Sequence, residues 1–153
     1  MPIINLSSEP LHSQFIRAAI DPAILRRPLA LCAVPAGFAS PARDYKGKSL
    51  DLNELLIRNS PATFFWKVKG HSMRDEGIND GDMVIVDRSI EAKNGHIVVA
   101  DINGDVAVKK LYRRGGVVEL RSANPEFEPR CFKDGEELTI WGVVTSVIHI
   151  FKS

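Results

Sequence analysis

A serine that could act as a nucleophile stands at position 72, within the stretch KVKGHSMRDEGINDGDMVIVD at residues 67–87. It follows a strand-like run and precedes a segment rich in glycine and acidic residues. Such a segment is typical of a surface loop or of the mouth of an active site. A serine hydroxyl attacks a carbonyl carbon poorly unless a neighbouring base takes its proton. The rest of the sequence must therefore supply a base for Ser72.

The histidines are poor candidates for that base. His71 is adjacent to Ser72, but adjacent side chains of an extended chain point to opposite faces. His12 and His96 fall near the N-terminus and at a predicted turn, and His149 falls in the apolar run VIHIF of the last predicted strand. For His149 a half-buried structural role is favoured over catalysis. No Ser/His/Asp arrangement is indicated.

Two lysines in an apolar strand are better candidates. Lysine accepts a proton only when it is neutral, and removal from water favours the neutral form. The run VAVKKL contains Lys109 and Lys110. A two-residue turn at Asn103-Gly104 predicts a hairpin in which Val98 faces Lys109, while Lys110 lies on the opposite face. This pattern favours Lys109 only slightly, and a lysine pair that protects a strand edge is an open alternative.

The elements that would carry these residues are mostly strands. Six short β-branched or aromatic runs follow Ala62: TFFWKVK, DMVIVD, HIVVADI, DVAVKKLY, VVELRS and LTIWGVVTSVIHIF. Gly115-Gly116 marks a second hairpin turn. Residues 49–58 predict a short helix capped by Asp51, with Leu52, Leu55 and Leu56 on one face. We therefore expect a mostly β, compact and largely antiparallel domain over residues 46–153.

The first 45 residues differ from the rest in composition. Six of the nine prolines lie within the first 41 residues, and each removes a backbone donor and favours extended geometry before it. We expect residues 1–45 to form a mobile arm, with at most a short helix around residues 11–20.

Composition excludes several other classes. The 153 residues are 44% hydrophobic, which suits one domain, and the net charge of +1 does not indicate a nucleic-acid binder. The sequence shows neither a run of about 18 apolar residues nor the pattern of a signal peptide, so a cytoplasmic location is predicted. Cys32 and Cys131 are isolated, and we predict no metal and no cofactor.

Several of these motifs occur together in an order that resembles the self-cleaving LexA and UmuD family of Ser-Lys peptidases. The matching residues are Gly70, Ser72 and Met73, then Gly81 and Asp82, then Val108 to Leu111, then Gly142 to Val144. The resemblance implies that Ser72 is the nucleophile and that Lys109, the first lysine of the pair, is the general base. The backbone N–H groups of Ser72 and Met73 would then form the oxyanion hole.

The same resemblance implies a cut at a bond between small residues upstream of the serine, here Ala36–Gly37. Small side chains let the backbone enter a narrow cleft, although a simple hinge would show the same residues. Too few residues precede Ala36 for a helix-turn-helix domain, which favours the UmuD branch, although the arm is longer than usual there. The implied function is in the SOS response to DNA damage, where residues 37–153 become a subunit of an error-prone translesion polymerase.

The partners implied in this way are a second copy of the chain, a RecA filament on single-stranded DNA as activator, and a UmuC-type polymerase. Sequence-specific DNA binding and a membrane are not expected. Two alternatives are a regulator without turnover, such as a co-repressor that lacks a DNA-binding domain, and a signal-peptidase-like protease. The long apolar run LTIWGVVTSVIHIF predicts either a homodimer or the completion of one core.

Overall fold

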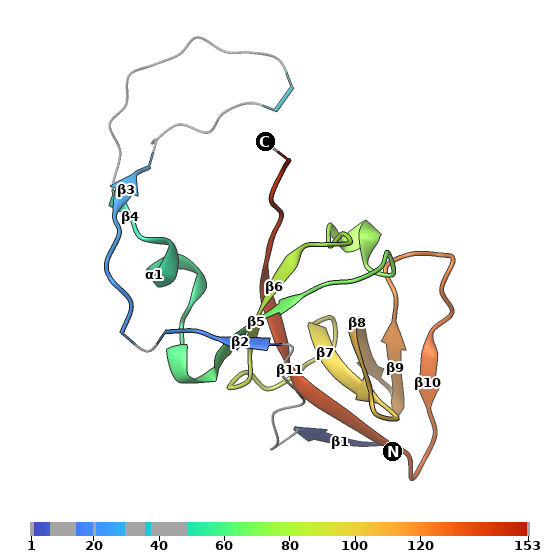
Figure 1. Ribbon diagram of the computed structural model, residues 1–153. Coiled ribbons are helices and arrows are strands. Elements are labelled where there is room, and N and C mark those ends of the chain that lie inside the picture. Colours follow the sequence, from blue (N-terminus) through green and yellow to red (C-terminus); the bar gives the residue numbers. More distant parts are fainter. Residues whose placement is uncertain (1, 7–14, 20, 30–35, 38–48, 153) are drawn as a thin grey trace.

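The computed structural model describes residues 2–6, 15–19, 21–29, 36–37 and 49–152. A nine-stranded sheet dominates it, in the order β10-β9-β8-β7-β11-β6-β5-β2, with β1 added to β11 (Figure 1). Neighbours along this order are antiparallel, and β1 is parallel to β11. The strands are β1 Ile3–Leu6, β2 Phe15–Arg17, β5 Thr63–Lys67, β6 Met83–Asp87, β7 Ile97–Ile102, β8 Asp105–Arg114, β9 Val117–Arg121, β10 Arg130–Phe132 and β11 Glu137–Ile148. The predicted fold class is confirmed.

The smaller elements lie outside this sheet. They are the two-stranded pair β3 Arg27–Pro28 and β4 Ser49–Leu50, the helix α1 Leu52–Leu56, and the 3-10 turns η1 Ser60–Ala62 and η2 Arg74–Glu76. No helix within the described ranges is long and apolar enough to cross a bilayer.

Both predicted hairpins are present, and the one at Asn103-Gly104 has the expected register. Asn103 and Gly104 adopt φ of 54° and 89°, the left-handed geometry that a primed two-residue turn requires. Across this turn Val98 pairs with Lys109 and Ile97 with Lys110. The pairing of β8 with β9 then continues through the turn at residues 115–116. Local turn chemistry therefore fixes which residue faces which along β7, β8 and β9.

Strand β11 joins the two halves of the sheet. It pairs with β7 along one edge and with β6 along the other, with a register shift in each pairing. Gly142 lies at the close approach to β6, where an added Cβ would stand 2.6 Å from Val86 Cγ1. The absence of a side chain at this position lets β11 pack against β6, so the glycine of the WGVV motif has a structural role.

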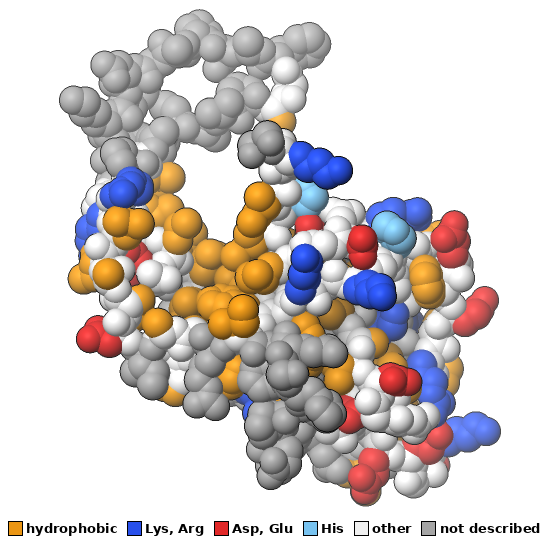
Figure 2. Space-filling view, viewed as in Figure 1, with side chains coloured by type: hydrophobic (Ala, Val, Ile, Leu, Met, Phe, Trp, Pro, Cys, Tyr) orange, Lys and Arg blue, Asp and Glu red, His pale blue; other side chains and the backbone are white. Residues whose placement is uncertain are grey.

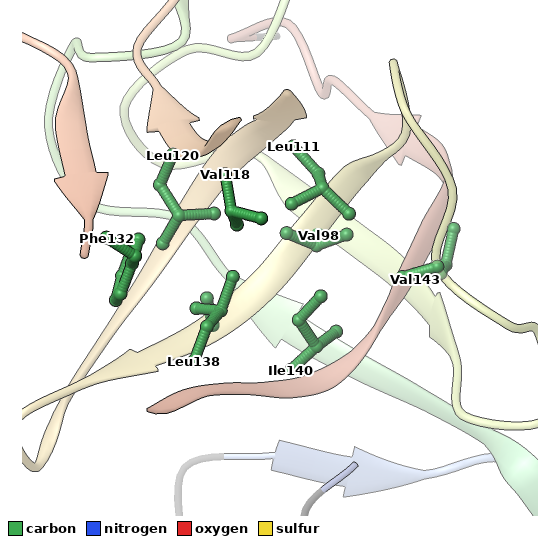
Figure 3. Close-up of a cluster of buried hydrophobic side chains, with 10 residues drawn as sticks. Val98, Leu111, Val118, Leu120, Phe132, Leu138, Ile140 and Val143 are labelled. Carbon is green, nitrogen blue, oxygen red and sulfur yellow. The ribbon is translucent and has the colours of Figure 1, made fainter. Parts of the chain in front are cut away.

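Two clusters of buried apolar side chains hold the strands together. Figure 3 shows the first, in which side chains from β7 to β11 point toward one another: Val98, Leu111, Val118, Leu120, Phe132, Leu138, Ile140 and Val143. The second gathers Phe64, Met73, Ile78, Val84, Val86, Val99 and Trp141. Trp141 is fully buried and meets Phe64 and Trp66 edge to face. The first half of β11 therefore completes the core.

Two of the described segments of the arm are strands of the large sheet. Ile3–Leu6 pairs with β11, and Phe15–Arg17 pairs with β5. The predicted helix over residues 11–20 is wrong at Phe15–Arg17, because the open edge of β5 offers these residues backbone partners. Its other positions, apart from residues 18 and 19, lie outside the described residues. The division into residues 1–45 and 46–153 stays a prediction.

Helix α1 is confirmed but shorter than predicted. The Asp51 carboxylate accepts hydrogen bonds from the backbone N–H groups of Asn53 and Glu54, as an N-cap does. The same carboxylate accepts from the Leu25 N–H at 2.5 Å, which ties the segment just before β3 to the start of the helix. The helix starts at Leu52 because the two residues before Asp51 are paired with β3.

Candidate active site

Ser72 lies in the loop between β5 and β6, and that loop is closed at its base. The Val68 N–H donates to the Asp82 carbonyl at 2.7 Å, and the Gly81 N–H donates to the Val68 carbonyl at 2.9 Å. Gly70 adopts φ of 94°, a conformation that favours glycine, and turns the chain just before Ser72. Met73 is 2% exposed and anchors the loop in the second core cluster. The Ser72 hydroxyl is therefore held beside a buried side chain, in a half-exposed position.

Lys109 reaches this serine from β8. Its Nζ lies 2.8 Å from the Ser72 Oγ and 2.9 Å from the Ser122 Oγ. The side chain is half-buried, and this burial lowers the pKa of Lys109. The geometry thus places a hydroxyl and an amine in direct contact, and burial shifts the amine toward its neutral form.

Among the described residues, Lys110 forms no hydrogen bond with Ser72. Its Nζ pairs instead with the carboxylate of Glu76, on η2. The two neighbouring lysines therefore have different environments, as their opposite faces predict.

Two of the described histidines, His71 and His149, make contacts away from the Ser72 hydroxyl. His71 is exposed, and its carbonyl accepts a hydrogen bond from Asn124 Nδ2 at 3.0 Å. His149 Nδ1 pairs with the buried carboxylate of Asp82, and its ring meets Phe151 edge to face. The predicted half-buried position of His149 is wrong, because the residue follows β11 and its side chain is 45% exposed. Its contact with Asp82 nevertheless gives it a partner other than Ser72.

A cavity of about 220 Å³ opens beside the serine. Its lining combines Ser72 and Met73 with apolar side chains from β5, the residue after it, β7 and β8: Trp66, Val68, Val99, Val106, Ala107 and Val108. Apolar walls of this kind suit an extended peptide that carries small side chains. A larger hollow of about 360 Å³ lies near α1 and β11 and contains neither Ser72 nor Lys109.

The backbone N–H groups of Ser72 and Met73 are available to an acceptor. Within the described part of the chain neither donates a hydrogen bond, whereas the next N–H, that of Arg74, donates to the His71 carbonyl at 3.3 Å. Two unused adjacent donors beside a nucleophile are what an oxyanion requires.

The predicted scissile bond does not lie at this site. Ala36 and Gly37 form an exposed bend and are absent from the lining of the cavity. In Figure 1 they form the short coloured segment within the grey trace at the top of the view, above the large sheet. The structure thus brings together Ser72 and Lys109 but leaves the Ala36–Gly37 bond apart from them.

Two neighbours of the pair escaped the sequence analysis. Ser122 contacts Lys109, and Asn124 contacts the loop of Ser72. A signal for Ser122 was present, because the Gly115-Gly116 turn places Arg121 opposite Lys110 and brings the next residue alongside Lys109. Asn124 follows the end of β9 in an irregular segment, where strand periodicity cannot predict which way a side chain points.

Comparison with known families and proteins gives a consistent result. The family described as Peptidase S24-like matches residues 28–145. Protein ImpA of Escherichia coli is 43% identical over 124 residues, which cover 80% of this chain and 83% of that protein. Protein SamA of Salmonella typhimurium is 40% identical over 133 residues, 87% of this chain and 92% of that protein. The LexA repressor of Bordetella avium is 38% identical over 116 residues, 76% of this chain and 54% of the repressor.

Proposed function

The chain belongs to the S24-like peptidase family, as a UmuD-like protein of the SOS response to DNA damage, and we propose that it cuts its own backbone with Ser72 and Lys109. The observation that carries this proposal is the contact of 2.8 Å between Lys109 Nζ and Ser72 Oγ. The lowered pKa of Lys109 supports the role of base, because an ammonium has no lone pair with which to accept the serine proton.

In the first half of the reaction, the neutral Lys109 amine takes the Ser72 proton while Oγ bonds to the carbonyl carbon of Ala36. The carbonyl oxygen becomes an oxyanion, which the N–H groups of Ser72 and Met73 would stabilise. The Lys109 ammonium then gives its proton to the Gly37 nitrogen as the Ala36–Gly37 bond breaks. An ester between Ser72 and Ala36 remains, and Lys109 is neutral again.

In the second half, Lys109 takes a proton from a water molecule while the oxygen of that water attacks the carbonyl carbon of the ester. The ester bond breaks, and the proton returns to Ser72 Oγ. Residues 1–36 leave with a new carboxyl terminus, and residues 37–153 remain as the processed form. Neither half of this reaction needs a metal or an oxidant.

The position of the Ala36–Gly37 bend implies a step before chemistry. The bend is exposed and apart from Ser72, so the bond must enter the cleft before it is cut, from the same chain or from a second copy. An activator such as a RecA filament on single-stranded DNA can act by favouring this docked state, without adding a chemical group.

We propose further that the processed form works as a homodimer and as the partner of a UmuC-type translesion polymerase. Support for self-association comes from exposed apolar side chains. Figure 2 shows such side chains gathered over α1 and beside the C-terminal end of β11, where Leu52, Leu55, Val147, Ile150 and Phe151 are exposed. Patches of this kind mark surfaces that other proteins cover.

Intact mass after incubation of the purified chain at alkaline pH tests the proposal. We expect two fragments, residues 1–36 and 37–153, and a single unchanged mass for Ser72→Ala. An unchanged mass for the natural chain, with and without RecA filaments, would instead favour a regulator that acts without turnover. Fragments that end at another residue would keep the peptidase and move the cut.

A further inference from the structure

We propose that Ser122 is a positioning residue for the base, because its Oγ accepts a hydrogen bond from Lys109 Nζ and so aims the amine at Ser72. The inference rests on the proposed function, since it assigns a role within the same reaction. The two contacts of the amine are nearly equal in length, 2.8 Å to Ser72 and 2.9 Å to Ser122.

The segment that carries Ser122 is fixed to the loop of the nucleophile. The Ala123 carbonyl accepts from the Asp75 N–H at 2.8 Å, and Asn124 Nδ2 donates to the His71 carbonyl at 3.0 Å. Asn124 is 3% exposed, and its Oδ1 accepts from the Glu126 N–H at 3.0 Å. The chain just after β9 is therefore bound to the loop on both sides of Ser72, and the Ser122 hydroxyl has a defined place relative to the Ser72 hydroxyl.

The hydrogen-bonding capacity of a neutral amine explains why this place matters. Neutral Nζ has two N–H groups and one lone pair. Catalysis requires the lone pair to face the Ser72 hydroxyl, and an N–H donated to the Ser122 Oγ leaves the lone pair free to do so. Without that acceptor the long lysine side chain has more rotamers, and the amine turns its lone pair to Ser72 for a smaller fraction of the time.

The same hydroxyl has a second and opposite effect on Lys109. A hydroxyl oxygen accepts a hydrogen bond more strongly from an ammonium than from an amine, so Ser122 stabilises the charged form. Loss of Ser122 should then lower the pKa of Lys109 further while it slows the fully deprotonated enzyme. A change that merely loosened the fold would admit water and raise this pKa toward its ordinary value.

The test compares Ser122→Ala and Ser122→Thr with the natural chain in self-cleavage from neutral to strongly alkaline pH. We expect Ser122→Ala to lower the plateau rate about tenfold or more and to move the midpoint of the profile to lower pH. Ser122→Thr keeps the hydroxyl and should stay within about threefold at the plateau. A plateau for Ser122→Ala close to that of the natural chain, or Ser122→Thr as slow as Ser122→Ala, overturns the proposal.

Two further measurements separate this proposal from the one on which it rests. If Ser72→Ala still cleaves, the proposed function fails; if Ser72→Ala is inactive and Ser122→Ala is fully active, only the role of Ser122 fails. The Lys109 pKa can also be read without cleavage, from the lysine ¹³Cε resonances of the Ser72→Ala chain, with Lys109→Arg for assignment. Adding Ser122→Ala should lower that midpoint, and a rise would contradict the proposal even if the rates changed.

Discussion

Lys109 Nζ lies 2.8 Å from Ser72 Oγ although 37 positions separate the two residues in the chain. Ser72 comes from the loop between β5 and β6, and Lys109 comes from β8, on the other side of β11 in the sheet. The contact is therefore a product of the whole sheet. Each partner can be changed separately, and the proposed reaction gives each change a distinct result.

Ser72→Ala should abolish self-cleavage and leave the fold intact. The nucleophile is lost, so the rate should fall by a factor on the order of 10⁴ or more. Removal of one half-exposed hydroxyl should change the free energy of unfolding by no more than about 0.5 kcal/mol. Intact mass and thermal unfolding measure the two effects, with Ser60→Ala as the matched control at η1. Normal fragment yield from Ser72→Ala would remove the serine from the mechanism.

Lys109→Arg and Lys110→Arg should have opposite effects on self-cleavage: the first should abolish it and the second should preserve it. A guanidinium stays protonated at every accessible pH, so Lys109→Arg cannot accept the serine proton and should be inactive throughout. Lys110 pairs with Glu76, and arginine can keep that ion pair, so Lys110→Arg should retain activity within about threefold. Activity in Lys109→Arg would mean that another group is the base.

The rate of self-cleavage should rise with pH and then level off. Below the pKa of Lys109 only the neutral fraction reacts, so each pH unit should raise the rate about tenfold. Burial lowers this pKa, so the plateau should begin below the value of about 10.4 for an ordinary lysine. If RecA filaments favour the docked state, they should move the plateau to lower pH still. A flat profile would contradict a lysine base.

Gly37→Val should slow the reaction strongly, by about 100-fold, because a β-branched side chain enters the cleft beside the scissile bond. The bend at residues 36–37 is exposed, so the change should leave the stability of the uncut chain unaltered. Fragment yield over time measures the effect, and Ser40→Val is a control for added bulk nearby. Normal processing of Gly37→Val would place the cut at another bond.

Stability should depend on the charge of Asp82. Burial raises the pKa of this carboxyl, but the Asn79 N–H and His149 outweigh that effect, so the pKa is lowered. A lowered folded-state pKa means that the stabilisation is complete above the unfolded-state value, about 3.9, and is lost as pH falls through the folded-state value. Asp82→Asn should therefore lower the melting temperature at neutral pH by several degrees, since a loss of 1 kcal/mol lowers it by about 2–4 °C in a chain of this size. The difference between the two proteins should shrink toward pH 3. An equal loss with Asp105→Asn, at the tip of the β7–β8 hairpin, would show a general charge effect instead.

The parts of the fold that the sequence predicts well are those fixed by local chemistry. The Asn103-Gly104 turn determines the register up to Lys109, and Asp51 determines the start of α1. Phe15–Arg17 was predicted wrongly because its structure depends on β5, nearly 50 positions away in the chain. A local pattern contains no information about such a distant strand edge.

The residues of the site also differ in how far local sequence predicts them. Periodicity favoured Lys109 over Lys110 only slightly, because their relation to Ser72 depends on how β11 enters between β6 and β7. The resemblance to Ser-Lys peptidases supplied the choice that periodicity could not. Ser122 could have been found by counting across the Gly115-Gly116 turn, whereas the contact of Asn124 with the Ser72 loop depends on an irregular segment.

The place of β11 in the sheet also determines when a newly made chain could first cut itself. Ribosomes release the chain from its N-terminus, so both Ser72 and Lys109 emerge before Glu137–Ile148. Within the sheet, the half that carries the serine and the half that carries the lysine are joined only through this late strand. If Ser72 and Lys109 act as proposed, a nascent chain contains both groups before they can meet, and we expect self-cleavage only after synthesis has passed β11.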